Sequence, residues 1–168
     1  MIEHPDLENL LIDSTVVRAH ACSARAKGGG EQALGRSKGG FSTKIHTVTD
    51  GLGNPIDFTL TGGHTHDVTE APALLLCKKA ERVLVDKGYD SNELIRIIRD
   101  LGAEPVIPPR KNRKELREYD RYIYKQRHLI ECFFSKIKYY RRVFSRFDKL
   151  ARNYWSFVCF ASALIWLR

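Results

Sequence analysis

Four residues between positions 124 and 138 place a phenol, a carboxylate and two cations at a spacing that suits one helix face. They are Tyr124, Arg127, Glu131 and Lys138. At 100° per residue, a helix brings these side chains within roughly 60° of arc. A carboxylate among cations on one stripe is suited to holding a metal ion against a phosphate group.

Two further acids are associated with short apolar runs that predict strands. Asp13 interrupts the β-branched run of residues 10–17, and Asp86 follows the run of residues 82–85. Aspartate is disfavoured inside a strand, and α/β sheets place functional sites at the carboxyl ends of their strands. Each acid also has a plainer interpretation: Asp13 as a surface acid on a half-exposed strand, and Asp86 as a turn former.

Glu131 has a plainer interpretation as well, which is an ion pair with Arg127 four residues earlier, worth only tenths of a kcal/mol. The combination of three acids changes the balance. Carboxylates brought within a few ångströms of each other repel unless a cation neutralises them. Hard oxygen ligands at that density select Mg²⁺ or Mn²⁺, and two such ions about 4 Å apart suit phosphodiester chemistry. We therefore expect Asp13, Asp86 and Glu131 to bind two ions.

The charge distribution points to a polyanionic partner. The chain of 168 residues carries a net charge of +8. Residues 110–152 hold 15 Lys and Arg against 5 Asp and Glu, so the rest of the chain is slightly acidic. A basic segment on a near-neutral body favours nucleic acid, although a solvated basic face is the plainer alternative. Arg141 and Arg142 extend this segment, and we expect them to contact DNA phosphates with Tyr124, Arg127 and Lys138.

The four cysteines and the polar amino terminus favour a reducing compartment over secretion. No CxxC pair is present, which disfavours a zinc ribbon, and residues 1–9 are too polar for a signal peptide. The apolar stretch of residues 155–167 is too short to span a bilayer. We therefore expect a protein of the reducing cytoplasm.

The order of elements predicts an α/β fold in one domain over residues 1–168. Tight links should make the first three strands antiparallel, and the later strands, each reached through a helix, should be parallel. The result is a mixed five-stranded sheet flanked by helices. The expected strands are 10–17, 41–49, 56–60, 82–85 and 105–108; the expected helices are 68–80 with Asp67 as N-cap, 90–101, 119–140 and the segment after Asn153.

Residues 19–40 differ in composition from the rest of the chain. They hold six of the twelve glycines together with several cations. We expect a flexible, basic, glycine-rich loop, which is longer than compact domains usually contain. It could clamp DNA or act as a linker, and the sequence does not separate these two roles.

These residues resemble the catalytic half of DDE transposases from bacterial insertion sequences. The Y-R-E-K signature of one subgroup matches Tyr124, Arg127, Glu131 and Lys138 without a gap. Four further stretches look similar to that group: IDSTVVRAH, ALGRSKGGFSTKIH, DGLGNPIDFTLTGG and VLVDKGYDS. The resemblance covers most of residues 10–168.

The resemblance implies an RNase H-like fold in which Asp13, Asp86 and Glu131 bind two Mg²⁺ or Mn²⁺ ions. It also implies DNA strand cleavage at transposon ends, followed by attack of the freed 3′-hydroxyl on target DNA. We expect a homodimer to carry out these steps, because two DNA ends must be joined. The family's N-terminal end-recognition region has no counterpart before the first strand, so an upstream reading-frame product is an expected partner. Two alternatives stay open: a non-catalytic DNA-binding regulatory fragment, and another RNase H-like nuclease such as a resolvase.

Overall fold

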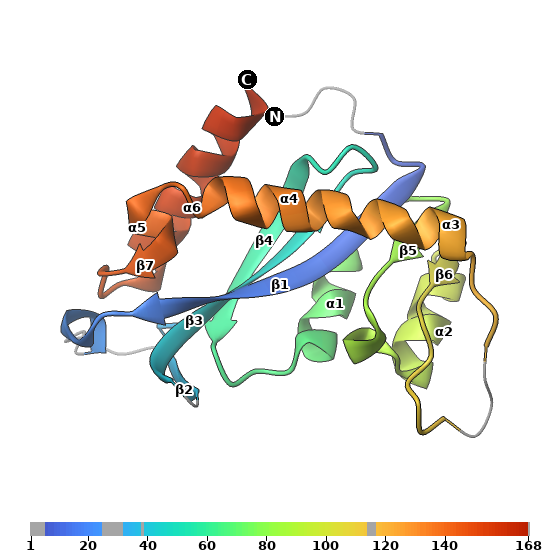
Figure 1. Ribbon diagram of the computed structural model, residues 1–168, viewed down its shortest axis with the longest axis horizontal. Coiled ribbons are helices and arrows are strands. Elements are labelled where there is room, and N and C mark those ends of the chain that lie inside the picture. Colours follow the sequence, from blue (N-terminus) through green and yellow to red (C-terminus); the bar gives the residue numbers. More distant parts are fainter. Residues whose placement is uncertain (1–5, 25–31, 38, 114–116, 168) are drawn as a thin grey trace. The chain divides into compact units, whose positions relative to one another are not determined.

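The computed structural model describes residues 6–24, 32–37, 39–113 and 117–167 (Figure 1). Strands, α-helices and short 3-10 helices alternate along the chain. In order they are β1 (Asn9–Ala19), η1 (Ala21–Ala24), β2 (Gly35–Ser37), β3 (Gly40–Thr49), β4 (Pro55–Gly62), α1 (Asp67–Leu75), β5 (Arg82–Leu84), η2 (Lys87–Tyr89), α2 (Asn92–Asp100), β6 (Glu104–Val106), α3 (Arg121–Tyr124), η3 (Lys125–Arg127), α4 (His128–Ile137), α5 (Arg141–Phe144), β7 (Ser145–Arg146) and α6 (Ala151–Trp166).

The strands pair in the order β2-β3-β1-β5-β6, with β4 also on β3 and β7 also on β1. β5 pairs in parallel with β1 and with β6, whereas β2 is antiparallel to β3. This confirms the predicted mixed sheet flanked by helices, although it has seven strands rather than five. β2 and β7 contain only three and two residues, which is too short to produce a recognisable alternation in sequence.

The chain divides into two compact units. The first contains Met1–Asp13, Thr47–Phe58 and His66–Cys132, and the second contains Ser14–His46, Thr59–Thr65 and Phe133–Arg168. β1, β3, β4 and α4 contribute residues to both units. Asp13, Asp86, Tyr124, Arg127 and Glu131 all belong to the first unit, whereas Lys138, Arg141 and Arg142 belong to the second.

The core of the first unit lies between its strands and the helices α1 and α2. Alternate residues of β1 and of the β5 segment point into this core. The buried cluster contains Leu10, Ile12, Val83 and Val85 from the strand segments, with Leu74, Leu75, Leu94 and Ile98 from the helices. The intervening residues Leu11, Asp13, Leu84 and Asp86 therefore fall on the opposite face of these strands.

The second unit contains a buried arginine that the sequence did not identify. Arg146 in β7 is fully buried, and its guanidinium donates to Thr43 Oγ1 (2.6 Å) and to the carbonyl of Ala33 (3.1 Å). It also lies over the ring of Tyr154 at 5.4 Å. Burial lowers the pKa of Arg146. Neutral oxygens thus accept from the guanidinium, and the hydrogen bond to Thr43 connects β7 to β3. The contact with the Tyr154 ring connects β7 to α6.

Several local predictions are wrong. α1 begins after His66 as N-cap, so Asp67 is its first residue and not the cap, and the helix ends at Leu75. Ser91 caps α2 by accepting from the Leu94 N–H (3.1 Å), whereas Asp90 is buried. α6 begins at Ala151, before Asn153. Part of the expected loop over 19–40 forms η1 and β2, while residues 25–31 and 38 lie outside the described residues.

The single helix expected over 119–140 is interrupted. α3, the 3-10 turn η3 and α4 follow one another, and α4 ends at Ile137. The carbonyl of Lys125 contacts Nδ1 of His128 (2.9 Å) where the backbone tightens. A 3-10 turn brings residues i and i+3 into line, so Tyr124 and Arg127 still lie on the same side.

The buried carboxylate of Asp90 organises the segment after β6. Its side chain is 1% exposed and accepts from Arg113 Nε and Arg117 Nη2, both at 2.5 Å. It also accepts the backbone N–H of Arg110 (2.9 Å). Burial by itself would raise the pKa of Asp90, but these hydrogen bonds and the arginine charges outweigh burial and lower it.

No helix among the described residues is long and apolar enough to cross a membrane.

The lowered pKa of Asp90 predicts a pH-dependent contribution to stability. Because the folded-state pKa lies below that of the unfolded chain, the contribution is complete above about pH 4 and is lost as pH falls through the folded value. Near neutral pH, Asp90→Asn should cost about 2 kcal/mol, since charge-assisted hydrogen bonds are lost. Urea unfolding of both proteins between pH 7 and pH 3 checks this: the difference should shrink at the acid end, and a constant difference would contradict it.

Candidate active site

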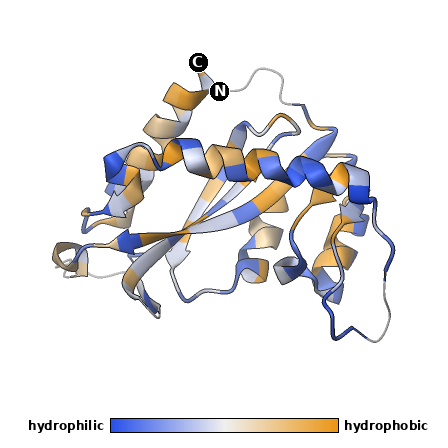
Figure 2. Ribbon diagram, viewed as in Figure 1, coloured by the Kyte–Doolittle hydropathy of each residue, from blue (hydrophilic) through white to orange (hydrophobic). Residues whose placement is uncertain are grey.

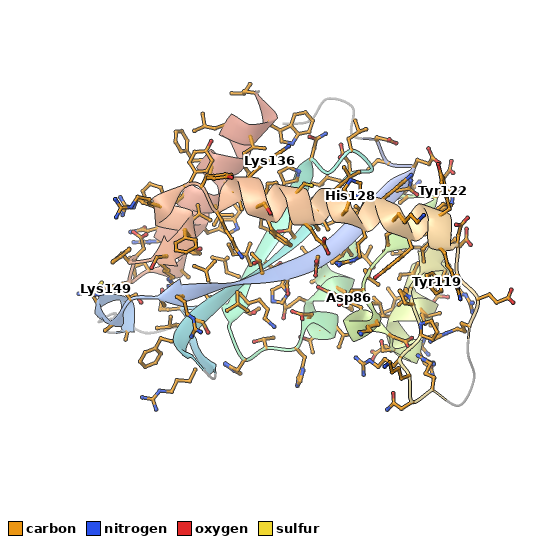
Figure 3. All side chains as sticks on the ribbon, in the orientation of Figure 1. Asp86, Tyr119, Tyr122, His128, Lys136 and Lys149 are labelled. Carbon is orange, nitrogen blue, oxygen red and sulfur yellow. The ribbon has the colours of Figure 1, made fainter. Side chains whose placement is uncertain are left out.

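The two aspartates come from neighbouring parallel strands. β1 and β5 pair with Leu10 opposite Val83 and Leu11 opposite Leu84. Continuing this register by two residues brings Asp13 opposite Asp86, and neighbouring strands lie about 4.8 Å apart. Both side chains are partly exposed, on the strand face that does not enter the core. Asp86 lies where the chain leaves β5 for η2 (Figure 3).

Arg127 joins two of the three predicted acids. Its Nη1 donates to Asp13 Oδ2 at 2.7 Å, and its Nη2 donates to Glu131 Oε1. The side chain of Arg127 is 17% exposed, as against 19% for that of Asp13 and 55% for that of Glu131. Burial alone would lower the pKa of Arg127, but the neighbouring negative charges, with Asp13 first, raise it. Arg127 therefore stays protonated throughout the physiological range.

Tyr124 completes the group on this side of the first unit. Its hydroxyl oxygen accepts a hydrogen bond from Arg127, and the charge of Asp86 acts on it. Burial is the main cause that raises the pKa of Tyr124, so the phenol stays protonated. Tyr124 thus contacts Arg127 of the Asp13–Arg127 pair and also lies near enough to Asp86 to be affected by its charge.

Three contacts in the first unit hold η3 and the start of α4. The first is the Arg127–Asp13 ion pair. In the second, Asn9 Nδ2 donates to Gln126 Oε1 at 3.0 Å. In the third, Gly53, at φ 84° in the β3–β4 turn, lies so close to Leu129 that a Cβ on it would be 3.0 Å from the Leu129 Cβ. For the second and third contacts the sequence offers only weak signals: Asn9 is a polar residue at a strand start, and Gly53 is a glycine in a turn.

The plainer interpretations of the acids are also visible. Asp86 accepts the N–H of Gly88 at 2.6 Å and caps η2, as a turn former would. Glu131 pairs with Arg127 four residues before it. Both contacts also belong to the larger arrangement, because the same arginine binds Asp13 and the turn starts at the carboxyl end of a strand.

The donor set fits a hard divalent cation in type. Asp13 and Glu131 already share one cation, Arg127, as expected for clustered carboxylates that need neutralising. Within the described ranges, however, no three His, Cys, Asp or Glu side chains lie together as a group that could hold a metal. Among the described residues, Asp13, Asp86 and Glu131 therefore do not form a preassembled three-acid cluster.

The remaining predicted residues belong to the second unit. Lys138 follows α4, and burial lowers its pKa. Arg141 is exposed at the start of α5. Arg142 donates to Asp148 Oδ1 at 3.1 Å, and its guanidinium lies 4.0 Å from the ring centroid of Phe157. Their role in binding phosphate stays a prediction.

The bridging position of Arg127 predicts measurable coupling with Asp13. In a double-mutant cycle with Asp13→Asn and Arg127→Gln, without divalent metal, we expect a coupling energy of about 1–2 kcal/mol because the pair is mostly buried. Lys78 and Asp57 form a more exposed pair at 2.9 Å and serve as the control, with about 0.5 kcal/mol expected. Urea unfolding measures both cycles. Equal coupling in the two pairs would contradict the bridging role.

Comparison with known proteins identifies the family. A family model described as the transposase DDE domain matches residues 4–164. Over 130 residues the chain is 39% identical to a putative transposase for insertion sequence element IS6501 of Brucella ovis, which covers 76% of this chain and all of that protein. Over 135 residues it is 30% identical to a putative transposase for element IS402 of Burkholderia cepacia, which covers 73% of this chain and 62% of that protein.

Two solved structures resemble the chain more distantly. A piggyBac transposase synaptic complex with hairpin DNA has a TM-score of 0.40 and 16% identity, over 66% of this chain and 24% of that one. A Mos1 transposase paired-end complex has a TM-score of 0.40 and 11% identity, over 78% of this chain and 54% of that one. The chain thus spans about half or less of these two proteins. On the match of the family model, the chain belongs to the transposases with a DDE domain.

Proposed function

We propose that this chain cuts DNA strands and joins the freed 3′ end to target DNA, as the catalytic domain of an insertion-sequence transposase. The observation that carries the proposal is the cation shared by Asp13 and Glu131. Asp86 lies two residues beyond the last observed pair of β1 and β5, Leu11 with Leu84, where the same register would bring it beside Asp13. The match to the transposase DDE family supports it.

The proposed reaction is a pair of phosphoryl transfers. In the first, a water oxygen attacks phosphorus and the P–O3′ bond breaks, which leaves a 3′-hydroxyl. In the second, the oxygen of that hydroxyl attacks a target phosphorus and forms a new P–O bond while the target's P–O3′ bond breaks. The proton of the attacking hydroxyl passes to solvent, and the leaving 3′-oxygen takes up a proton. Asp13, Asp86 and Glu131 would hold two Mg²⁺ or Mn²⁺ ions, which supply activation of the attacking oxygen and charge stabilisation at the leaving oxygen.

The chain's own cations and phenol would orient the phosphate. Arg127 keeps its charge because its pKa is raised, so it can donate to a phosphoryl oxygen as negative charge develops there. The protonated Tyr124 hydroxyl can donate as well. We expect weak, mostly sequence-independent DNA binding, because contacts to phosphate dominate when base-reading elements are few.

The proposal includes further predictions from the sequence. The partners are transposon-end and target DNA, bridged by a homodimer of this chain. The site of action is the bacterial cytoplasm, at the nucleoid. Residues 1–168 act as one RNase H-like catalytic domain, in which Lys138, Arg141 and Arg142 also contact phosphate.

Metal-dependent nicking of plasmid DNA tests the proposal. We expect Asp13→Asn, Asp86→Asn and Glu131→Gln each to lower nicking in Mg²⁺ or Mn²⁺ on the order of 10³-fold, since the three acids act as a unit. DNA binding should persist. The control is Asp100→Asn, which removes an exposed acid from α2. Strand transfer is measured separately, with a labelled 3′-hydroxyl end.

The outcomes separate the alternatives. DNA binding without nicking in any divalent metal would favour a non-catalytic regulatory protein. Cutting that requires the acids but never joins ends would favour another RNase H-like nuclease. Nicking that survives all three substitutions would overturn the proposed site.

A further inference from the structure

The segment after β6 carries a dense group of cations that the proposed site does not use. We define the basic strap as Arg110, Lys111, Arg113 and Arg117, all in the first unit. Figure 2 shows hydrophilic residues along this connection between β6 and α3. Arg110 and Lys111 are exposed, whereas Arg113 and Arg117 are largely covered by their contacts with Asp90.

Asp90 fixes the strap but does not neutralise it. One carboxylate binds two guanidinium groups and one backbone N–H, so the strap keeps a surplus of positive charge. Arg113 also donates to Asn92 Oδ1 at 2.7 Å. Because Asp90 is 1% exposed and fully engaged, its role is to position these groups and not to meet solvent or substrate.

Arg110 lies on the turn that begins with Asp86. Its Nε donates to the carbonyl of Lys87 at 3.1 Å, and its Nη2 donates to the carbonyl of Gly88. Gly88 in turn donates its N–H to Asp86. These two neutral carbonyls hold the guanidinium of Arg110 within two residues of a candidate catalytic acid.

The far end of the strap also returns to the candidate site. Tyr119, two residues beyond Arg117, packs edge-on against Tyr124 with ring centroids 5.5 Å apart. Tyr124 contacts Arg127 and is influenced by the charge of Asp86. The strap therefore contacts the turn after Asp86 through Arg110, and Tyr119, just beyond the strap, contacts Tyr124 of the proposed active site.

We propose that Arg110 and Lys111 contact phosphates of the DNA that flank the reacting one, and that Asp90 is the positioning residue that holds them beside Asp86. The inference rests on the proposed function and extends it to residues outside the signature. Exposed cations on a fixed backbone suit a repeating polyanion, whose phosphates are bound without reading of base sequence.

The salt dependence of binding to a DNA duplex, measured by fluorescence anisotropy, tests the contacts. Lys111→Gln and Arg110→Gln should each make the plot of log K against log salt about one unit less steep, and should weaken binding about tenfold at low salt. Arg96→Gln, which removes an exposed cation from α2, should leave the slope unchanged. Slopes for both strap variants equal to those of the wild type and Arg96→Gln would overturn the proposal.

Asp90→Asn distinguishes positioning from simple electrostatics. It removes a negative charge, so charge alone predicts tighter DNA binding, whereas loss of the anchor predicts weaker binding with a shallower slope and faster proteolysis of the strap. Asp100→Asn is the charge-matched control and should bind at least as tightly as the wild type. Tighter binding by a folded Asp90→Asn would contradict the positioning role. Circular dichroism reports its folding, and if it is unfolded the two strap variants decide.

Failure of this inference can be told from failure of the proposed function. If the wild type nicks DNA and needs its three acids, but Lys111→Gln and Arg110→Gln keep the full salt slope, only the inference fails. If the wild type does not bind DNA, both fail.

Discussion

The candidate site depends on one electrostatic constraint: carboxylates gathered at one place need a cation. In this chain the cation is Arg127, which binds Asp13 and Glu131 together. Asp13 comes from β1, whereas Arg127 and Glu131 come from η3 and α4, so the pair also ties a strand to a helix more than a hundred residues later. Removing one partner leaves the other charge partly buried and unpaired, so a single substitution in such a pair destabilises the fold.

The same constraint explains how acids on one short turn differ in role. Asp86 and Asp90 are four residues apart in the sequence DKGYD. Asp86 is half-buried and accepts from Gly88, whereas Asp90 is buried and bound by two arginines. Environment separates the two aspartates: Asp86 is partly exposed at a strand end and is a proposed metal ligand, whereas Asp90 holds basic residues in position.

Much of this arrangement follows from the sequence. The apolar runs predict β1 and β5, and their parallel pairing predicts that Asp13 and Asp86 are neighbours. The four-residue spacing predicts the contact between Arg127 and Glu131. Periodicity also predicts α2, which ends at Asp100, two residues before Gly102 at φ 80°.

The remainder depends on contacts distant in sequence. β2 and β7 are too short to show a pattern. β7 also contains a buried arginine, Arg146, whose acceptors include Thr43 and the carbonyl of Ala33, both more than a hundred residues earlier. Asp90 looked like a helix start because Ser91, the true cap, is its neighbour; its arginine partners lie more than twenty residues later. Nor does helical spacing reveal the 3-10 turn at 125–127.

We propose that Asp13, Asp86 and Glu131 serve one metal site. The most direct test replaces Mg²⁺ with Fe²⁺ in the folded protein, adds ascorbate and peroxide, and maps backbone cleavage by mass spectrometry. We predict cleavage near all three acids, suppressed together by excess Mg²⁺ and lost together in Asp13→Asn. Cleavage near only one of the acids, or at sites that Mg²⁺ does not protect, would contradict the account.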